Sequence, residues 1–549
     1  MRLHGLKYLT FCITPCLLLC ASSVGTVAAT TDAGDSVTVT VNPGSKHPIS
    51  PWVYGINNAT EVEGRPAGVT LDRSGGNRWT AYNWETNASN AGSDYLYQND
   101  DSMGNDAEAG SGVSSRIAKD QKAGMASLVT FQLQGLVAGD TKGPVAVTSP
   151  PDKTRFKKVF YEKKTVTDEP FTVKPSTSDN YVFMDEFIWA LDRKFAGQNI
   201  FGARPARLPV FADLDNEPEL WKMTHLEVQG PNGISSDDFI ARTVALATAL
   251  KKQFPEVVIF GPGNYGFLGL YNWNGEINTT ATANNWFADK YLMALHNAST
   301  AFGKPLVDVY EFHWYPEATD SAGKRVTTLS DAKLTSDQVQ AIVQAPRSLY
   351  DQTYKEKSWV MNVISRPIAI IDRLQVRINA DSPGTKLAIG EYDTGGGQHI
   401  AGTIAEADNL GIFGARGLFA ATLWPLTKEP YSLAGFRAYR DFDGAGHNFG
   451  DTSIEATSSN LADVVVYVST DSTRAGRVVM VAINRSEAQQ VTQVTGQPLS
   501  GTAHLFQMTA ATAAKQSTVK PIAAGTRPAS GSAITLELPP LSVTTVDIY

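Results

Sequence analysis

Cysteine is almost absent from this chain of 549 residues, and its placement is more informative than its number. All three cysteines, Cys12, Cys16 and Cys20, fall within the first 29 residues. If that segment is removed as a leader, the mature protein has no thiol, which excludes disulfides, cysteine-ligated metals and a cysteine nucleophile. The eight histidines show no metal-ligand spacing, so we expect no metal in the catalytic site.

Positive charge is also scarce. The chain has 47 lysines and arginines against 55 aspartates and glutamates, a formal net charge of −8, and no basic cluster. This balance argues against nucleic acid and anionic membranes as partners. A neutral polysaccharide remains compatible, because aromatic rings and hydrogen bonds can bind it without charge. No segment after the first 29 residues is apolar enough over a membrane-spanning length.

Residues 1–29 have the pattern of a signal peptide: basic residues, the apolar run Phe11–Leu19, and the small-residue cleavage motif Val27-Ala28-Ala29. We therefore expect a secreted protein, extracellular or periplasmic, with no membrane contact after signal removal. The sequence around Cys20 also resembles a lipoprotein attachment site, although the preceding leucine is bulkier than such sites usually tolerate.

Apolar strands alternate with helical stretches over residues 49–440, which predicts an α/β fold, a (β/α)₈ TIM-like barrel. The strand candidates are Val53–Asn57, Val69–Arg73, Ala126–Gln132, Pro209–Asp215, Val257–Gly261, Val307–Trp314, Lys386–Glu391 and Gly417–Leu423. We expect the insertion 316–385 to cover the active-site face. Residues 441–549 read as short strands with turn signals, which predicts a β-sandwich, and residues 30–48 supply an N-terminal strand that joins it.

Two glutamates stand at the ends of predicted strands. Glu217 lies in Asp215-Asn-Glu-Pro218, where the proline ends the strand because it has no N–H to donate. Glu391 follows the apolar run 386–390. In a (β/α)₈ barrel, catalytic groups stand at the carboxyl ends of strands. Two carboxylates in such positions are the pair of catalytic groups that a glycosidase requires.

One long block of unusual residues carries a family resemblance. The stretch Arg73–Tyr95 resembles the signature of glycoside hydrolase family 44, the secreted endoglucanases and xyloglucanases. Other segments agree in order: Asp215–Pro218 with Trp221, His313–Pro316, Glu391-Tyr392, and Asp441–Gly444 leading to Phe449–Ser453. The resemblance covers nearly all of the mature chain. It implies a barrel with a β-sandwich, retaining cleavage of β-1,4-glucan backbones, and no redox cofactor.

Under this interpretation Glu217 is the general acid/base and Glu391 the nucleophile of a double displacement, which requires carboxyl groups about 5–5.5 Å apart. The alternative for Glu217 is a structural carboxylate that pairs with a nearby cation. Alternation along the strand would place Asp213, Asp215 and Glu217 on one face, so that Asp215 could tune or orient Glu217.

Several further side chains are expected to bind substrate. Asn216 should hydrogen-bond the sugar 2-hydroxyl beside the scissile bond. Arg73 and Asn77 should orient the −1 sugar and the nucleophile, the alternative being that they only satisfy loop carbonyls. One of His313 and Tyr315 should contact the nucleophile or a sugar hydroxyl.

Aromatic platforms complete the expected site. Trp424 suits the floor of the −1 subsite, and the resemblance implies that Trp359 stacks on a sugar further out. Tyr95 stands where the family would have tryptophan, which would weaken a platform without affecting the chemistry. The segment Asp441–Gly446 resembles a fragment of a calcium loop but lacks the acidic twelfth position, so a glycine-rich turn is favoured. No cofactor is required, and a structural calcium ion elsewhere is compatible with the sequence.

The sequence therefore predicts a secreted retaining endo-β-1,4-glucanase, expected to be a monomer, that acts on xyloglucan, cellulose-type and mixed-linkage glucans. A β-mannanase or xylanase with the same two carboxylates is an alternative, because the residues leave the backbone preference open. A non-catalytic glycan-binding protein is another alternative. Release of reducing ends would distinguish an enzyme from a binding protein.

Overall fold

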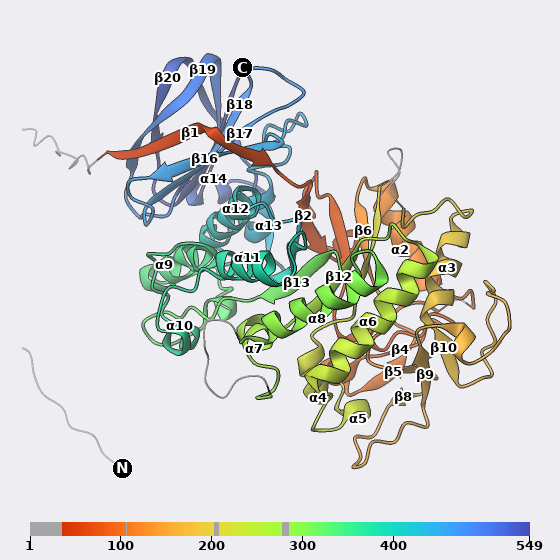
Figure 1. Cartoon of the computed structure of the whole chain (residues 1–549). Coiled ribbons are helices and arrows are strands. Elements are labelled where there is room, and N and C mark those ends of the chain that lie inside the picture. The colour runs from red at the N-terminus through yellow and green to blue at the C-terminus, as the bar shows by residue number, and fades with distance from the viewer. Residues whose placement is uncertain (1–35, 106, 203–207, 277–284) are drawn as a thin grey trace, which may run out of the picture.

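A computed structural model describes residues 36–105, 107–202, 208–276 and 285–549. The predicted signal peptide, residues 1–29, lies outside the described residues. Two parts are visible in Figure 1: a barrel surrounded by helices, and a C-terminal sheet crossed by the N-terminal strand. No helix in the described part of the chain is long and apolar enough to cross a bilayer.

The barrel is closed and contains eight strands that run parallel. Each predicted strand is present, with ends shifted by a few residues. The strands, in their order around the barrel, are β2 (Trp52–Asn57), β3 (Leu71–Ser74), β6 (Ala126–Thr130), β11 (Val210–Asp213), β12 (Ile259–Asn264), β13 (Val309–Trp314), β14 (Lys386–Tyr392) and β15 (Ala420–Leu423). The predicted fold class, a (β/α)₈ barrel with an additional β-sandwich, is confirmed.

Helices cover the outside of the barrel, and their ends follow ordinary capping chemistry. The principal helices are α2 (Ser111–Lys122), α3 (Met184–Lys194), α6 (Ser236–Gln253), α8 (Phe287–Phe302), α11 (Ile370–Asp381) and α12 (Ile400–Ala415). In α6 the Ser235 hydroxyl accepts from the backbone N–H of Asp238, and lysines occupy the last turn. The hydroxyl satisfies a free backbone N–H at the start of the helix, and the lysine charges interact favourably with the helix dipole at its end.

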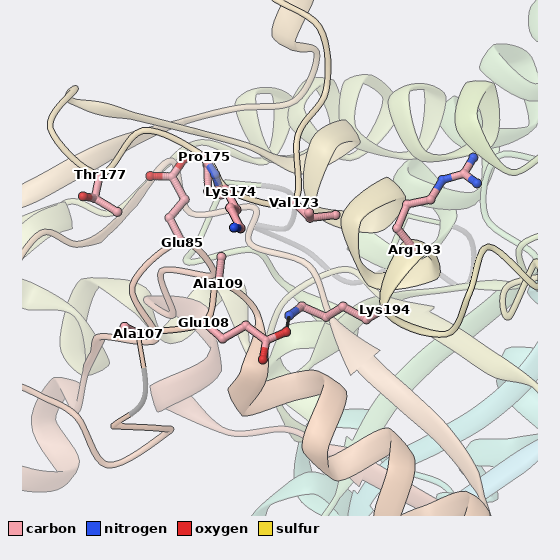
Figure 2. A pocket seen from close by; sticks show the side chains of 10 residues that line it. All are labelled: Glu85, Ala107, Glu108, Ala109, Val173, Lys174, Pro175, Thr177, Arg193 and Lys194. Atoms are coloured by element: carbon pink, nitrogen blue, oxygen red, sulfur yellow. Dashed lines mark hydrogen bonds and ion pairs between the residues drawn. The ribbon is translucent and has the colours of Figure 1, made fainter.

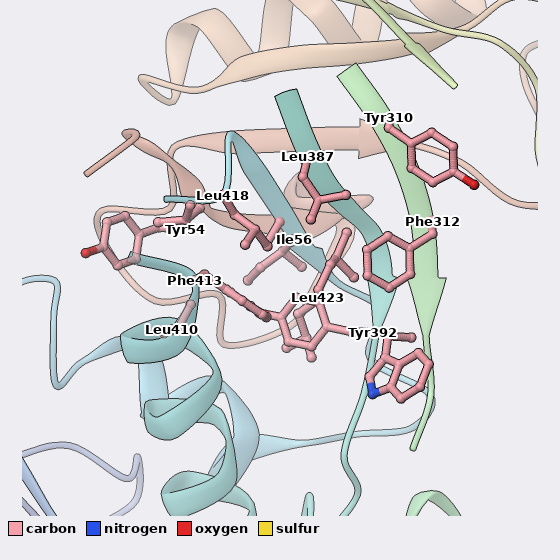
Figure 3. Close-up of a cluster of buried hydrophobic side chains, with 14 of the residues drawn as sticks. Tyr54, Ile56, Tyr310, Phe312, Leu387, Tyr392, Leu410, Phe413, Leu418 and Leu423 are labelled. Carbon is pink, nitrogen blue, oxygen red and sulfur yellow. The ribbon is translucent and has the colours of Figure 1, made fainter. Parts of the chain in front are cut away.

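Barrel strands are buried on both faces, by helices on the outside and by the other strands on the inside, and most of their residues are apolar. On the outside, Leu410 and Phe413 of α12 pack against strand residues, and the Phe413 ring lies 5.0 Å from that of Tyr392 (Figure 3). Inside, the end of the barrel opposite the candidate site is filled by Phe211 and neighbouring rings, with Phe260 at 5.6 Å between centroids. This apolar plug supports the polar layer above it.

Short strands extend the barrel wall after β3 and β6. They form two small sheets, one of β4 (Ser89–Asn90), β5 (Gln98–Asp100) and β8 (Gly143–Pro144), the other of β7 (Leu136–Ala138), β9 (Phe156–Phe160) and β10 (Tyr181–Phe183). Strand β4 of the first sheet lies within the block 73–95 that carries the family resemblance, β5 follows this block, and β8 comes from the segment after β6. This block is therefore an excursion at the carboxyl end of β3.

The insertion 316–385 contains η5 (Val326–Thr328), α9 (Ser336–Gln344), η6 (Ala345–Leu349), α10 (Trp359–Ile364) and α11. From α9, Gln344 donates to the Ala462 carbonyl at 2.8 Å, so this helix lies against the C-terminal sheet. At the barrel rim, the Trp359 ring of α10 lies 5.8 Å from Phe267 of α7 (Gly266–Tyr271). Arg325 donates to the Tyr315 carbonyl after β13 at 2.7 Å, and the Leu329 carbonyl accepts from the Gly396 N–H after β14 at 2.7 Å. Part of the insertion therefore lies at the carboxyl end of the barrel, and α9 bridges the barrel and the C-terminal sheet.

The C-terminal sheet has seven strands: β1 (Val37–Pro48), β16 (Thr452–Ser458), β17 (Val464–Thr470), β18 (Val478–Asn484), β19 (Gln490–Thr509), β20 (Ile522–Leu538) and β21 (Ser542–Ile548). The first part of β19 pairs with β1 and the last part with β21, so the sheet folds back on itself. Gly496 lies at this bend with φ 96°, and a Cβ there would be 2.3 Å from the Val41 carbonyl oxygen. Glycine is required at this position.

Helix α12 joins the barrel to the sandwich through a buried ion pair. Asp408 accepts from Arg485 Nη2 at 2.6 Å and from the Tyr467 hydroxyl at 2.6 Å. A Cβ at Gly411 would lie 2.2 Å from the Tyr467 ring, so the helix and the sheet are in direct contact. The two parts therefore pack through a tight interface that includes a desolvated pair of charges.

We expect Asp408→Asn to destabilise the protein strongly, by about 3–5 kcal/mol, because it leaves the Arg485 charge buried without a counter-ion. Thermal unfolding followed by calorimetry measures the effect. Glu63→Gln is the matched control, since the Glu63–Lys428 pair is exposed and is expected to contribute less than about 1 kcal/mol. Equal unfolding temperatures for the two variants would contradict a stabilising role for the interface pair.

Candidate active site

Glu391 is the next-to-last residue of β14, and two side chains hold its carboxylate. Arg73 Nη1 donates to Oε1 at 2.8 Å, and the Tyr315 hydroxyl donates to Oε2 at 2.9 Å. Burial, together with the charges of Glu391 and Glu217, raises the pKa of Tyr315 well above its usual value, so the phenol remains a donor. Each oxygen of Glu391 therefore has its own donor, and the two bonds fix the orientation of the carboxyl group.

Arg73, from β3, is fully buried and connects the strands of the site. Its Nε donates to Asp213 at 3.0 Å, its Nη1 to Asn57 at 3.1 Å, and its Nη2 to Asn216 at 3.2 Å. Burial opposes the charge, but the neighbouring carboxylates, including Glu391, raise the Arg73 pKa above its usual value. The guanidinium is thus a permanent cation with a fixed orientation.

Glu217 is not on the strand itself. Strand β11 ends at Asp213, and both Asp215 (φ 72°) and Glu217 (φ 42°) adopt left-handed backbone conformations. The alternation expected from Asp213 to Glu217 was therefore wrong, because it holds only for extended backbone. The Asp215 carboxylate accepts instead from the Thr80 hydroxyl at 2.6 Å and the Leu133 N–H at 2.6 Å. It anchors the loops around Glu217 and does not contact the Glu217 carboxyl. Non-glycine residues in this conformation are uncommon and concentrate at functional sites.

The Glu217 carboxyl has the environment of a group that exchanges protons. Burial raises its pKa to about 7, while Arg73 lowers it and Asp94 raises it. His313 Nδ1 lies 2.9 Å from Glu217 Oε1, and the Glu217 side chain is 14% exposed. Because Oε1 faces the imidazole, Oε2 is the oxygen that can carry and deliver a proton.

The protonation of His313 follows from its neighbours. Arg73 Nη2 lies 3.3 Å from His313 Nε2 and can only donate, so Nε2 accepts and Nδ1 carries the hydrogen. Burial lowers the His313 pKa to about 4, which keeps the ring neutral at ordinary pH. The Nδ1–H then donates to Glu217 and lies 3.5 Å from Glu391 Oε2. His313 fixes both carboxyl groups in relation to each other.

One oxygen of Glu217, one ring nitrogen of His313 and one oxygen of Glu391 all lie within 4.8 Å of one another. Such a set could hold a cation by composition alone. However, His313 presents an N–H and not a lone pair to this space, and Glu217 has a raised pKa. The group is arranged to move protons, and its residues fit a metal poorly.

Asn216 is oriented from two sides. Its side-chain oxygen accepts from Arg73 Nη2 and from the Gly76 backbone N–H, both at 3.2 Å. The amide N–H₂ is therefore the part that remains for a sugar hydroxyl. Its role as a ligand of the 2-hydroxyl stays a prediction.

Asn77 is held away from the nucleophile. Its side-chain N–H₂ donates to Asp94 at 2.8 Å, and its backbone carbonyl lies 3.0 Å from Nε2 of the buried His225. Asn77 thus orients Asp94, whose charge raises the pKa of Glu217. Contact of Asn77 with the −1 sugar remains a prediction.

The three predicted aromatic platforms are all accessible. Trp424 follows β15, and a Cβ at Gly76 would lie 2.8 Å from its ring, so the indole lies beside the β3 tip. Trp359 is 38% exposed and Tyr95 is 56% exposed at the end of η2 (Gly92–Tyr95). Their contacts with sugar remain predictions.

Two residues in the polar layer were missed by the sequence analysis. Glu311 lies within 3.2 Å of Arg73, and Asn57 accepts from the same guanidinium. A signal existed for Glu311, because it precedes His313 by two residues on a strand and therefore shares its inward face. For Asn57 the signal was its place at the last residue of β2.

Two other features lie apart from the carboxyl pair. The pocket in Figure 2, about 650 Å³, lies beside α3 and is partly closed by the Lys194–Glu108 ion pair; none of its lining residues is a predicted site residue. In the segment resembling a calcium loop, Asp441 accepts from the Gly446 N–H at 2.7 Å and Asp443 from the Ala445 N–H at 2.9 Å. These N–H groups occupy the carboxylates, as in a hydrogen-bonded turn. A structural calcium ion elsewhere stays a prediction.

Several buried carboxyls have raised pKa values, which makes stability depend on pH. Burial raises the pKa of Glu356 to about 7 and those of Glu219 and Glu406 to about 8. Between their usual value near 4.5 and these values, the folded state holds protons that the unfolded state has lost. Stability therefore falls as pH rises, by up to about 1.4 kcal/mol per pH unit for each group.

We expect the unfolding temperature to be higher at pH 5 than at pH 8, as measured by differential scanning calorimetry. Glu406→Gln should flatten the slope, since an amide accepts from the Tyr392 hydroxyl without titrating. An unfolding temperature that is level or increases over this range would contradict the raised pKa values.

Two carboxyl groups at the carboxyl end of a closed parallel barrel, one held by an arginine and a tyrosine and one with a raised pKa, are the arrangement of a glycoside hydrolase. Comparison with known proteins agrees. The sequence model of glycoside hydrolase family 44 matches residues 88–318. A family 44 xyloglucanase of Paenibacillus polymyxa is 32% identical with a TM-score of 0.84; the alignment covers 93% of this chain and 99% of that chain.

Two curated relatives are each 35% identical. The alignment with endoglucanase A of Paenibacillus lautus covers 84% of this chain and 65% of that protein. The alignment with beta-mannanase/endoglucanase A of Caldicellulosiruptor saccharolyticus covers 83% of this chain and 34% of that protein. The chain therefore spans about a third of that longer protein. This chain belongs to glycoside hydrolase family 44.

Proposed function

We propose that the protein is a retaining endo-β-1,4-glucanase, with Glu217 as general acid/base and Glu391 as nucleophile. The observation that carries the proposal is the approach of the two carboxyl groups to within 4.8 Å, oxygen to oxygen. Retaining enzymes need carboxyls about 5–5.5 Å apart, whereas inverting enzymes need about 6.5–9.5 Å to admit a water molecule. The separation therefore supports direct attack by one carboxylate.

In the first step, Glu391 attacks the anomeric carbon while Glu217 protonates the glycosidic oxygen as the bond to it breaks. The Arg73 and Tyr315 donors hold Glu391 as an oriented anion. The Glu217 pKa of about 7 keeps this group protonated in mildly acidic solution, so the acid and the nucleophile coexist in their active forms.

In the second step, water attacks the glycosyl ester and Glu217 removes a proton from it. Esterification has by then neutralised Glu391, and loss of a negative charge so close lowers the pKa of Glu217. The same residue can therefore act as a base. His313 keeps Glu217 Oε1 fixed through both steps.

The surroundings support a neutral glucan as substrate. Trp424, Trp359 and Tyr95 offer ring faces for sugar C–H groups, and Asn216 offers N–H donors. We propose xyloglucan, cellulose-type and mixed-linkage glucans as substrates of a monomeric, secreted enzyme. Secretion rests on the pattern in residues 1–29, and N-terminal sequencing of protein from the medium checks it.

A second candidate is β-mannanase activity, which the printed name of the Caldicellulosiruptor relative favours. The experiment that separates the candidates measures reducing-end release from xyloglucan, mixed-linkage glucan, mannan and xylan, with product anomers followed by NMR. Release from a glucan with a β-anomer as first product is expected. A first α-anomer would overturn retention, faster cleavage of mannan would favour the second candidate, and inertness on every polysaccharide would favour a binding protein.

A further inference from the structure

The carboxyl group of Glu311 lies beneath the two candidate catalytic residues, and the proposed reaction does not use it. Glu311 is on β13, two residues before His313, and is fully buried. Its Oε1 lies 3.2 Å from Arg73 Nε, and the same nitrogen donates to Asp213 Oδ2 at 3.0 Å. One guanidinium N–H thus faces two carboxyl groups and can bond fully to only one.

Glycines make the space that Glu311 occupies. A Cβ at Gly390, the residue before Glu391, would lie 1.6 Å from Glu311 Oε1. On the other side, a Cβ at Gly263 would lie 3.9 Å from Oε2, and the Gly263 carbonyl accepts from the Glu217 backbone N–H at 3.0 Å. The carboxyl therefore lies between the strand that carries Glu391 and the loop that carries Glu217.

The buried oxygens of this carboxyl lack hydrogen-bond donors among the described residues. If both side chains are ionised, no backbone or side-chain group among the described residues donates to either Glu311 oxygen or to Asp213 Oδ1. Both carboxyls lie against the same Arg73 Nε, and a proton on one of them would supply the donor that the buried oxygens of the pair lack. Burial and the Asp213 charge raise the pKa of Glu311 well above its usual value, against the effect of Arg73. The proton therefore belongs to Glu311.

We propose that Glu311 is a positioning residue: a neutral carboxylic acid that donates its proton to Asp213 and thereby fixes the Arg73 guanidinium beneath Glu391. With Glu311 neutral, only Asp213 and Glu391 share the Arg73 charge. An ionised Glu311 would compete with Glu391 for it and weaken the 2.8 Å bond that orients the nucleophile. The inference rests on the proposed function, because it concerns how the nucleophile of that site is held.

Charged and titratable groups from three strands and one helix face Glu311. Arg73 comes from β3, Asp213 from β11 and Glu391 from β14, and all three act on its charge. Burial raises the pKa of Tyr291 of α8, so this neighbour remains a neutral phenol. Glutamine in place of Glu311 retains the shape and an N–H donor for Asp213, whereas methionine removes the donor.

The test compares kcat, KM and pH profiles of wild type, Glu311→Gln and Glu311→Met on xyloglucan. We expect Glu311→Met to lose about 100-fold in kcat with KM changed less than about threefold, and its acid limb to move to higher pH as Arg73 loosens from Glu391. Glu311→Gln should recover kcat to within about fivefold of wild type with the acid limb unmoved. Glu356→Gln, a buried carboxyl in the insertion, is the matched control and should leave the profile as in wild type.

Two results would overturn the proposal. A Glu311→Gln variant whose acid limb moves to lower pH would show that an ionised group had been removed beside Arg73. A Glu311→Met variant with wild-type kcat would show that the residue does not position the nucleophile.

Difference infrared spectroscopy at neutral pH tests the proton directly. Wild type minus Glu311→Gln should show one carbonyl band of a protonated carboxylic acid, and absence of that band would reject the neutral form. This readout does not depend on catalysis and also decides the question if Glu311→Met fails to fold. An enzyme inert on all glucans would reject the proposed function but leave the infrared result standing.

Discussion

Glu391→Gln should abolish glucan hydrolysis, with a fall in kcat of more than about 10⁴-fold, because an amide cannot form the covalent glycosyl ester. KM should change little, since binding depends on the sugar contacts. The Arg73 and Tyr315 bonds exist to hold an anion, and a neutral amide meets two donors with only one acceptor oxygen. Reducing-end release measures the loss, and protein mass after treatment with a 2-deoxy-2-fluoro glycoside locates the ester.

Labelling identifies the nucleophile independently of rate. Wild type should gain one label on the peptide that contains Glu391, and the variant should gain none. The matched control is Glu219→Gln: Glu219 is a buried acid near the site that accepts from the Tyr265 N–H at 2.7 Å, and this variant should label normally. A Glu391→Gln enzyme with more than a tenth of wild-type activity, or a label on another carboxyl, would refute the assignment.

Glu217→Ala should cost about 10²–10⁴-fold on polysaccharide, the usual contribution of general acid catalysis. On aryl glycosides with activated leaving groups, which depart without protonation, formation of the glycosyl-enzyme should remain fast and only its hydrolysis should slow. Added azide should then restore turnover and give a β-glycosyl azide. Burst kinetics and product NMR measure these results.

The pH profile provides a second test of Glu217. The wild-type basic limb should follow the group whose pKa burial raises to about 7, and Glu217→Ala should lose it. Asp94→Asn is a suitable control, because removing a charge that raises this pKa should move the basic limb to lower pH and leave the mechanism intact. Equal losses on activated and unactivated substrates, without azide rescue, would contradict the acid/base role.

The barrel strands could be predicted because each is covered on both faces, so a continuous apolar run stands out from the surrounding polar turns. Strand β14 (Lys386–Tyr392) differs from its prediction by one residue. The pattern failed where β11 ends, since Asp215 and Glu217 have positive φ and period-two alternation applies only to extended backbone.

The sequence by itself determined the class of protein and the eight strands and predicted the two acids, because these depend on local pattern and on residues adjacent along the chain. Only the tertiary structure decided that Arg73 and Glu391, 318 residues apart, meet at 2.8 Å, and that Glu311 lies beside both in space opened by Gly390. Barrel closure brings these groups together. Their charge states follow from burial and from each other, and neither quantity exists until the strands pack.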